Sequence, residues 1–351
     1  MAWRAPDNLR FYIQEARLVS INLSSSQPSV DAALHALPRR YRKLRAIHPL
    51  RLALFNEYCQ EWTDEFVPCV SLGEEDEDKE TGERFTVPCP PFYQVPSISL
   101  ARADSLKRLF TWIDLLPLES VRRAVHLLYP ETKAWSFASD ADDPDHAIFK
   151  CITWSRVVAH DDERHCRSAM SIFIQPPWVL SVCDLELFCK RQSVWAANNI
   201  EAFVADLCHQ FFGSSSSPST ELLHERPTTP HERLWYKLWD CCITRSCPWF
   251  VVSTYTHWVF GVFSNGWTAA FVSPVYSHDS HDPSVLQLLL FWLCSAMGFS
   301  GGWVVPEVRI EPAYPSHHLT ASVSDLAAGP LISRHLPSGP EMTRSASFDS
   351  I

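Results

Sequence analysis

The densest group of potential metal ligands in the sequence lies at residues 160–166. It offers imidazole, carboxylate and thiol groups in one short segment: His160, Asp161, Asp162, Glu163, His165 and Cys166. These donor types together suit zinc. Side chains that are adjacent in a turn point in different directions, however, and a closed metal site needs ligands from a second segment. We therefore expect a charged turn and no metal site.

Carboxylates suggest a second kind of chemistry, because acidic side chains can hold the divalent cations that assist hydrolysis. An acidic run spans residues 140–145, and a mixed cluster of His, Asp and Ser spans residues 278–282. The second cluster lacks ligands from another segment, and its Asp282 is well placed to cap a helix. A metal-dependent enzyme would bring to one concave point at least three of Asp142, Asp143, Asp161, Asp162 and Glu163.

Covalent and nucleotide chemistry lack their usual signatures. Cys241, Cys242 and Cys247 form no Cys-x-x-Cys pair. No serine lies in a nucleophile elbow, and the ten glycines form neither a dinucleotide-binding nor a Walker pattern. We expect no catalytic residue and no cofactor. The 12 cysteines should be mostly free and buried, because they lie in apolar patterns such as those around Cys151, Cys189, Cys208 and Cys294.

The charge balance argues against a nucleic-acid partner. The net charge is -10 and the pI is about 5.8, which does not suit a surface that follows a phosphate backbone. One basic cluster could bind nucleic acid or an importin groove. A solvated helix face whose charge complements that of the acidic residues 74–78 is the commoner case. The cluster consists of Arg39, Arg40, Arg42, Lys43 and Arg45.

An aromatic group near the C-terminal third could form a platform for stacked bases, as in proteins that bind single strands. Such platforms interleave cations with the rings, and residues 248–302 contain no lysine or arginine. Core packing is therefore the better interpretation for Tyr255, His257, Trp258, Trp267 and Tyr276.

Three strand-like runs surround these rings and predict an antiparallel meander. They span residues 249–255, 257–263 and 267–273, and Asn265-Gly266 is a strong hairpin signal between the last two. The first run is continuously apolar at its start, so we expect it to lie in the middle of a sheet. An apolar helix at 283–297 should follow, begun by Asp282-Pro283 and ended by Gly298. We expect one contact cluster to contain Phe250, Val252, Val259 and Leu289.

The middle of the chain predicts a strand pair followed by helices. Residues 148–158 and 169–174 have strand composition. Capping boxes at Ser181 and Thr229 predict two helix starts, and an apolar pattern predicts another helix near 200–211.

The N-terminal part predicts helices, with no assignment for residues 8–23. Residues 29–64 have a helical pattern divided by Pro38 and Pro49. Two amphipathic helices, at 106–116 and 121–128, should be separated by Pro117.

We expect an α+β, or mixed α/β, fold with a helical N-terminal part and a C-terminal sheet, containing the meander, covered by helices. The predicted organisation is a helical N-terminal region at 1–70, an acidic and proline-rich loop at 71–98, an α+β core at 99–312 and a disordered tail at 313–351. Within the tail, Ser347 follows Arg344 at the spacing of sites for basophilic kinases and is a hypothetical modification site.

Several motifs resemble a large set of proteins of mushroom-forming fungi with no assigned function. They are Pro177-Trp178-Val-Leu-Ser181, Leu238-Trp239-Asp240-Cys241, Thr254-Tyr255 with Trp258-Val-Phe-Gly261, Phe271-Val-Ser273 and Leu286-Gln287. A fainter resemblance is to the PD-(D/E)xK nuclease-like core, in which a strand pair supplies metal-binding carboxylates and a later strand and helix complete the sheet. The strand that should carry the acid and the lysine reads Ser171-Ile-Phe-Ile-Gln175, so the resemblance implies the fold without the chemistry.

We therefore expect a soluble intracellular protein, cytoplasmic or nuclear, that acts as a non-catalytic binding or scaffold protein. Its partner is unknown; a protein is one candidate, and nucleic acid is not expected. No membrane partner is expected, because no secretory segment and no long apolar run occur. The alternative is a metal-dependent nuclease-like enzyme that uses acidic residues of 140–145 or 161–163.

Overall fold

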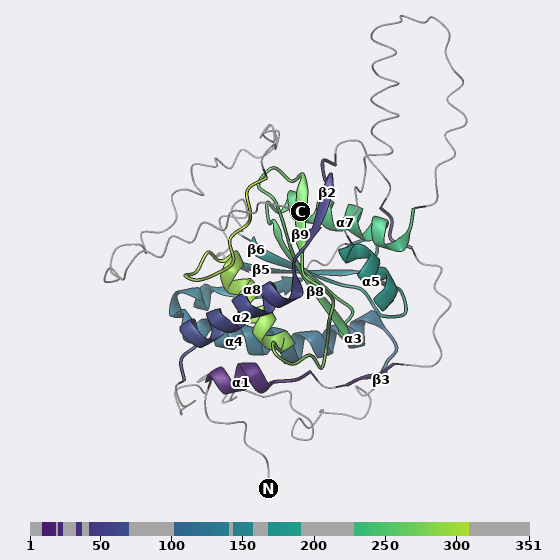
Figure 1. The fold of residues 1–351 in the computed structure, drawn as a ribbon. Coiled ribbons are helices and arrows are strands. Elements are labelled where there is room, and N and C mark those ends of the chain that lie inside the picture. Colours follow the sequence, from purple (N-terminus) through teal and green to yellow (C-terminus); the bar gives the residue numbers. More distant parts are fainter. Residues whose placement is uncertain are drawn as a thin grey trace, which may run out of the picture. The chain divides into compact units, whose positions relative to one another are not determined.

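A mixed eight-stranded sheet forms the centre of the fold, which is α+β as the sequence predicts (Figure 1). The computed structural model describes residues 9–18, 20–23, 33–36, 42–69, 102–139, 143–156, 168–190 and 228–308. All of them belong to one compact unit, Met1–Glu311, and the second unit, Pro312–Ile351, lies outside the described residues. Also outside them lie the predicted loop at 71–98, the turn at 160–165, the helix at 200–211, the tail and Ser347.

Strands β4 to β9 lie side by side in chain order, and β2 lies beside β9 at one edge of the sheet. The order is β2 (Ala46–Pro49), β9 (Ala269–Val272), β8 (His257–Phe263), β7 (Trp249–Ser253), β6 (Ser168–Ile174), β5 (Lys150–Arg156) and β4 (Trp135–Ser139). A short strand, β10 (Tyr276–Ser277), also pairs with β8. Neighbours are antiparallel except that β6 runs parallel to β7 and β2 runs parallel to β9. The predicted strand pair and the meander are confirmed.

The position of the first meander strand is also confirmed, because β7 lies between β6 and β8 and all five of its residues are buried. The last meander strand begins at Ala269, two residues later than predicted. The Ser264 carbonyl accepts a hydrogen bond from the Trp267 amide, and Trp267 has a φ of 61°. Trp267 therefore belongs to the turn and not to the strand.

The two faces of the sheet carry separate apolar layers. Trp249 and Val251 face α8 (Val285–Ala296) and share its cluster with Leu289. Phe250 faces the other way, with its ring 5.9 Å from that of Trp235 on α7 (Pro230–Thr244). The prediction that Phe250, Val252 and Val259 join Leu289 in one cluster is wrong. Alternate residues of a strand point to opposite faces, and these three side chains all lie on the α7 face.

Helix α8 is buried on all sides, as predicted, by the sheet and by surrounding helices that include α1 (Leu9–Glu15) and α2 (Leu52–Phe66). It begins two residues later than expected. The N-cap is Ser284, whose hydroxyl accepts from the Gln287 amide, whereas Asp282 has a φ of 47° in the preceding turn. Gly298 ends the helix in the left-handed region, as predicted.

The opposite face of the sheet is covered by α5 (Val182–Cys189) and α7, which lie apart from α8 in Figure 1. Both predicted capping boxes are present. Ser181 accepts from the amide of Asp184, and Thr229 accepts from the amide of Glu232. The ring of Trp235 stacks on that of Phe188 at 4.1 Å, which joins the two helices over the sheet.

Pro117 does not separate two helices as predicted. It lies within a π-helical turn, η3 (Asp114–Leu118), that connects α3 (Leu106–Ile113) to α4 (Glu119–Leu128) without a break. A wider turn accommodates the proline, which has no amide hydrogen to donate.

The prediction of helix across residues 29–64 is wrong for its middle part. Residues 46–49 form β2, and helix α2 begins only at Leu52. The pairing partner of β2 is β9, more than 200 residues away in the sequence, so no local pattern reveals it. Pro49 ends the strand, consistent with its exclusion from a helix interior.

Three short elements complete the described chain. A parallel pair joins β1 (Asn22–Leu23) to β3 (Arg102–Ala103), and a 3₁₀ turn, η4 (Pro130–Ala134), precedes β4. No helix among the described residues is both long and apolar enough to span a bilayer.

Gly261 provides a test of the packing on the α7 face. A Cβ at this position would lie 2.3 Å from the Phe250 ring, so Gly261→Ala should lower the free energy of unfolding by about 1–3 kcal/mol through overpacking. In a Phe250→Ala background, which itself costs about 3–5 kcal/mol, the same substitution should have little further effect. Urea unfolding of the four proteins of this cycle measures the coupling.

Gly298→Ala is the matched control, because no atom lies within 4 Å of a Cβ there and only the positive φ opposes it. Its expected cost is about 1 kcal/mol in either background. Equal costs of Gly261→Ala with and without the Phe250 ring would contradict the packing described.

Candidate functional site

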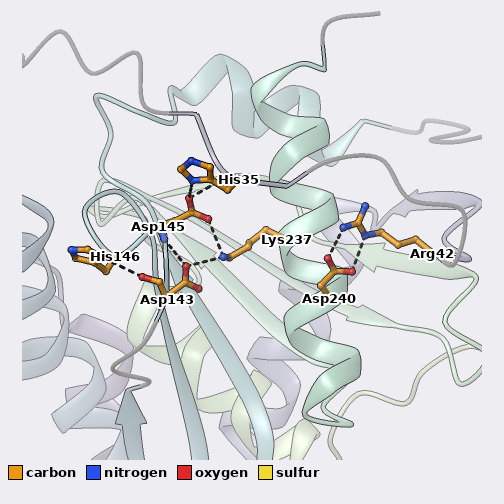
Figure 2. A network of polar contacts seen from close by, with 7 residues as sticks. All are labelled: His35, Arg42, Asp143, Asp145, His146, Lys237 and Asp240. Atoms are coloured by element: carbon orange, nitrogen blue, oxygen red, sulfur yellow. Dashed lines mark hydrogen bonds and ion pairs between the residues drawn. The ribbon is translucent and has the colours of Figure 1, made fainter. Parts of the chain in front are cut away.

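A buried polar network joins α7 to the turn before β5 (Figure 2). At its centre the Lys237 ammonium binds two carboxylates, with 2.7 Å from Nζ to Asp143 Oδ1 and 2.9 Å from Nζ to Asp145 Oδ2. The Asp145 side chain is fully buried and that of Asp143 is 18% exposed. The pair of carboxylates therefore shares one fixed cation.

A second segment reaches Asp145 from the N-terminal part of the chain. The backbone amide of His35 donates to Asp145 Oδ1 at 3.1 Å, and His35 Nδ1 lies 2.6 Å from the same oxygen. Burial alone would raise the pKa of Asp145, but the hydrogen bonds from Lys237 and His35 outweigh burial and hold the pKa below its usual value. Asp145 is thus a carboxylate that remains ionised while it anchors residues 33–36.

A separate ion pair lies one turn further along α7. The guanidinium of Arg42, almost completely buried, binds both carboxylate oxygens of Asp240, with 2.7 Å from Nε to Oδ1. The same guanidinium lies 4.9 Å from the centre of the Tyr236 ring. Arg42 therefore binds the segment before β2 to α7 through two hydrogen bonds to Asp240 and a cation–π contact with Tyr236.

Lys237 and Asp240 thus give one helix two anchors for the N-terminal part. In Figure 2 both side chains leave the same helix and point to different segments. The pKa of Lys237 is raised even though burial opposes its charge, because Asp143 and Asp145 both stabilise the ammonium. The arrangement can hold charge and position backbone segments, and every charged group named here is already engaged by another.

The carboxylates proposed for metal binding are only partly described. Of Asp142, Asp143, Asp161, Asp162 and Glu163, only Asp143 lies within the described residues, so their gathering stays a prediction. The turn residues His160 to Cys166 also lie outside. Within the described ranges, no group of three or more His, Cys, Asp or Glu side chains is arranged to hold a metal ion.

The second polar cluster, at 278–282, forms local contacts. Ser277 donates to an Asp279 carboxylate oxygen, and His278 Nε2 lies 3.1 Å from the Ser20 hydroxyl. Asp282 occupies a turn and is not a helix cap, which corrects the prediction. These groups bridge the β10 region to residue 20 at the surface.

The cysteines of the described segments are free, and most are buried, as predicted. Cys151, Cys189 and Cys294 are buried, whereas Cys208 lies outside the described residues. Burial raises the pKa of Cys247 to about 12, and it raises the pKa of Cys242 well above its usual value. Thiols with raised pKa values are poor nucleophiles at neutral pH.

The basic cluster and the aromatic group have structural contacts. Arg42 pairs with Asp240 and does not lie on a helix, so the expected solvated helix face is wrong at this residue. Arg39 and Arg40 lie outside the described residues. Tyr255, Trp258 and Tyr276 are buried in the core, as predicted, whereas His257 and Trp267 are only partly buried.

Sequence reasoning missed the partners that matter most here: His35, Arg42, Lys237 and Asp240. A usable signal was the pair Lys237 and Asp240 within the otherwise apolar stretch of α7, because charged groups at helix positions beside buried residues need partners. Their partners lie 90 or more residues away in the sequence, so only the fold identifies them.

Comparison with known proteins adds no relative. No protein-family description matches the chain, and neither the curated proteins nor the solved structures include a similar one. Function must therefore be argued from this site.

Asp145 should link stability to pH. Asp145→Asn should lower the free energy of unfolding at neutral pH by about 3 kcal/mol, because a buried ion pair loses one partner. The folded-state pKa of Asp145 lies below the unfolded value of about 3.9, so its contribution is complete above about pH 5 and is lost as the pH falls through the folded pKa. The variant should thus lose less stability between pH 5 and pH 3 than the natural protein in urea unfolding.

Asp104→Asn is the control for this titration. Asp104 forms an exposed ion pair with Arg108, whose removal should cost less than about 1 kcal/mol. The role given to Asp145 is wrong if the two variants have equal stability at pH 7.

Arg42 should hold β2 in place. Arg42→Lys removes the paired hydrogen bond to Asp240 and should accelerate exchange of the amides that bond to the β9 segment, those of Ala46 and Leu50, by about tenfold or more, equivalent to about 1.5 kcal/mol. The amides of β7 should keep their protection. Hydrogen exchange with mass spectrometry measures both, and Arg108→Lys at an exposed pair serves as the control.

Proposed function

We propose that the protein is a non-catalytic binding or scaffold protein of the cytoplasm or nucleus, built on a nuclease-like core whose chemistry has been lost. The observation that carries this proposal is the position of Lys237. Its ammonium nitrogen lies within 2.9 Å of carboxylate oxygens of both Asp143 and Asp145. An organic cation of the chain itself thus occupies the place between carboxylates that a hydrolytic metal ion would need.

The arrangement of strands and helices supports the nuclease-like core. The antiparallel pair β5 and β6 is followed by α5 and α7, and then by β7 parallel to β6. The PD-(D/E)xK resemblance implies a strand pair completed by a later strand and helix, and β5 and β6 with the later β7 and α8 are compatible with that description. Asp143 and Asp145 precede β5, the first strand of this pair.

The composition of β6 supports loss of chemistry. The resemblance implies an acidic residue and a lysine on this strand, and β6 carries Ser171, Ile172 and Phe173, all fully buried. No charged side chain of β6 reaches the carboxylates near β5, because the strand contains none. Among the described contacts, the Lys237 ammonium on α7 binds both carboxylates, and residue 35 adds hydrogen-bonding contacts to Asp145.

Free thiols support an intracellular location. All described cysteines are unpaired, which is typical of proteins in a reducing compartment. The acidic net charge of -10 favours a protein partner over nucleic acid.

The second candidate is a metal-dependent nuclease-like enzyme, and one observation favours it. Asp143 and Asp145 both approach one atom, Lys237 Nζ, and a metal ion that displaced the lysine would find two carboxylates already convergent. Activity would then depend on Asp145.

A cleavage assay distinguishes the two. The full-length protein is incubated with single-stranded and double-stranded DNA and RNA in Mg²⁺ or Mn²⁺, and Mn²⁺ binding is followed by calorimetry. We expect no cleavage and no saturable Mn²⁺ binding. Cation-dependent cleavage that Asp145→Asn abolishes and Asp104→Asn leaves intact would overturn the proposal in favour of the enzyme.

The binding role is tested separately by quantitative mass spectrometry of proteins recovered with the tagged chain from its native cells. We expect at least one protein at a fixed ratio to the chain, reproduced when the recovered protein is itself tagged. Recovery of the chain alone under all conditions would contradict a scaffold role.

A further inference from the structure

Two histidines lie at the paired ends of β8 and β10. His257 begins β8, and His278 directly follows β10, which runs antiparallel to the start of β8. Ser277 lies opposite His257 in this register, and the His278 amide donates to the Thr256 carbonyl at 2.9 Å. The backbone pairing of β10 with β8 therefore sets the positions of both histidines.

The His278 side chain connects β10 to the N-terminal part of the chain. Its Nε2 lies 3.1 Å from the hydroxyl of Ser20, in the segment between α1 and β1. The centre of its ring lies 6.3 Å from that of the buried Tyr255. The segment at residue 20 thus contacts the sheet through a histidine whose own position depends on β10.

The surroundings of His257 favour its neutral form. The ring is partly buried, and burial lowers the pKa of His257. A positive charge on His278 lowers this pKa further, whereas the carboxylates of Asp279 and of Glu186 on α5 oppose the effect. The net direction is downward, so burial and the second histidine outweigh the two carboxylates.

Asp279 keeps its charge in mild acid. Its carboxylate accepts a hydrogen bond from the Ser277 hydroxyl, and this bond is the main reason why the pKa of Asp279 lies below its usual value. The neighbouring His278 and His281 act in the same direction. A change in charge at this end of the sheet near pH 6 therefore comes from imidazoles.

We propose that His257 and His278 form a pH-sensitive switch, which keeps β10 and the segment at residue 20 on the sheet at neutral pH and releases them when both rings are positively charged. Like charges on paired strands repel each other. A charged His257 ring would also lose solvation through burial, because it lies at the strand pair. Opening of the pair relieves both effects.

The direction of the pH effect follows from His257. Its folded-state pKa lies below the ordinary value of about 6.5, so the neutral ring contributes fully to stability above about pH 6.5. This contribution is lost progressively as the pH falls from there through the folded-state pKa. Release of β10 would uncover Tyr276, whose buried ring lies 6.3 Å from that of Phe55 and 6.1 Å from that of Phe260. The inference goes beyond the proposed function and does not depend on it.

Hydrogen exchange of the full-length natural protein at about pH 7.5 and about pH 5.5 tests the switch, with each rate divided by the intrinsic rate at that pH. Protection of β10, His278 and residues 20–23 should fall by at least about threefold at the lower pH, whereas β7 should keep its protection. Equal protection of β10 at both pH values, or an equal loss in β7, would overturn the proposal.

Three variants separate the switch from a general effect of acid. Glutamine keeps hydrogen-bonding groups but gains no charge, so His257→Gln should abolish the pH effect on β10 and His278→Gln should reduce it. His146→Gln is the control, because His146 is exposed in the turn before β5 and should leave the effect unchanged. A full pH effect in folded His257→Gln protein would contradict the proposal. If a variant does not fold, the measurement on the natural protein decides.

Discussion

The fold depends on burying a sheet that is apolar on both faces. Every residue of β7 is buried, so a single layer of helices would leave half of the strand in water. Helix α8 covers one face and α7 covers the other, and neither layer is stable without the sheet between them. The two helical layers and the sheet therefore depend on one another for stability.

Tryptophan makes this burial possible without leaving donors unsatisfied. The indole nitrogen of Trp292 donates to the carbonyls of Phe250 and Gly261, and that of Trp235 donates to the Phe188 carbonyl. Large rings thus fill each layer while their single polar group pairs with backbone. Trp154 is different, because its buried indole nitrogen has no hydrogen-bond partner within the described part of the chain.

Helix α7 has two roles that use different sides of the same turns. Its Trp235 and Trp239 pack in the core, whereas its Lys237 and Asp240 bind the N-terminal segments through Asp145 and Arg42. The charges of α7 thus hold segments of the chain together that are distant in sequence.

Features that depend on residues close together in the sequence, such as helix starts and hairpins, were predicted correctly. The capping residues Ser181 and Thr229 begin helices, and the alternating strands of the meander form as expected. The assignment of β2 to a helix failed because this four-residue strand is stabilised by partners far away in the sequence, above all by pairing with β9. The polar network was missed for the same reason: Asp145 looked like one member of an acidic run until the fold brought Lys237 beside it. The prediction at Pro117 failed for another reason. Proline usually ends a helix, but here a π-helical turn accommodates it.

The pairing of β2 with β9 sets an order of events during synthesis. Residues 46–49 leave the ribosome long before residues 269–272, so this edge of the sheet cannot close until more than 200 further residues have been translated. Contacts between α1 and α8 impose the same delay on the start of the chain. Contacts of such long sequence separation slow folding and expose apolar segments meanwhile. Apolar residues of the nascent N-terminal part, such as those of α1 that pack on α8, therefore lack their final partners until α8 emerges.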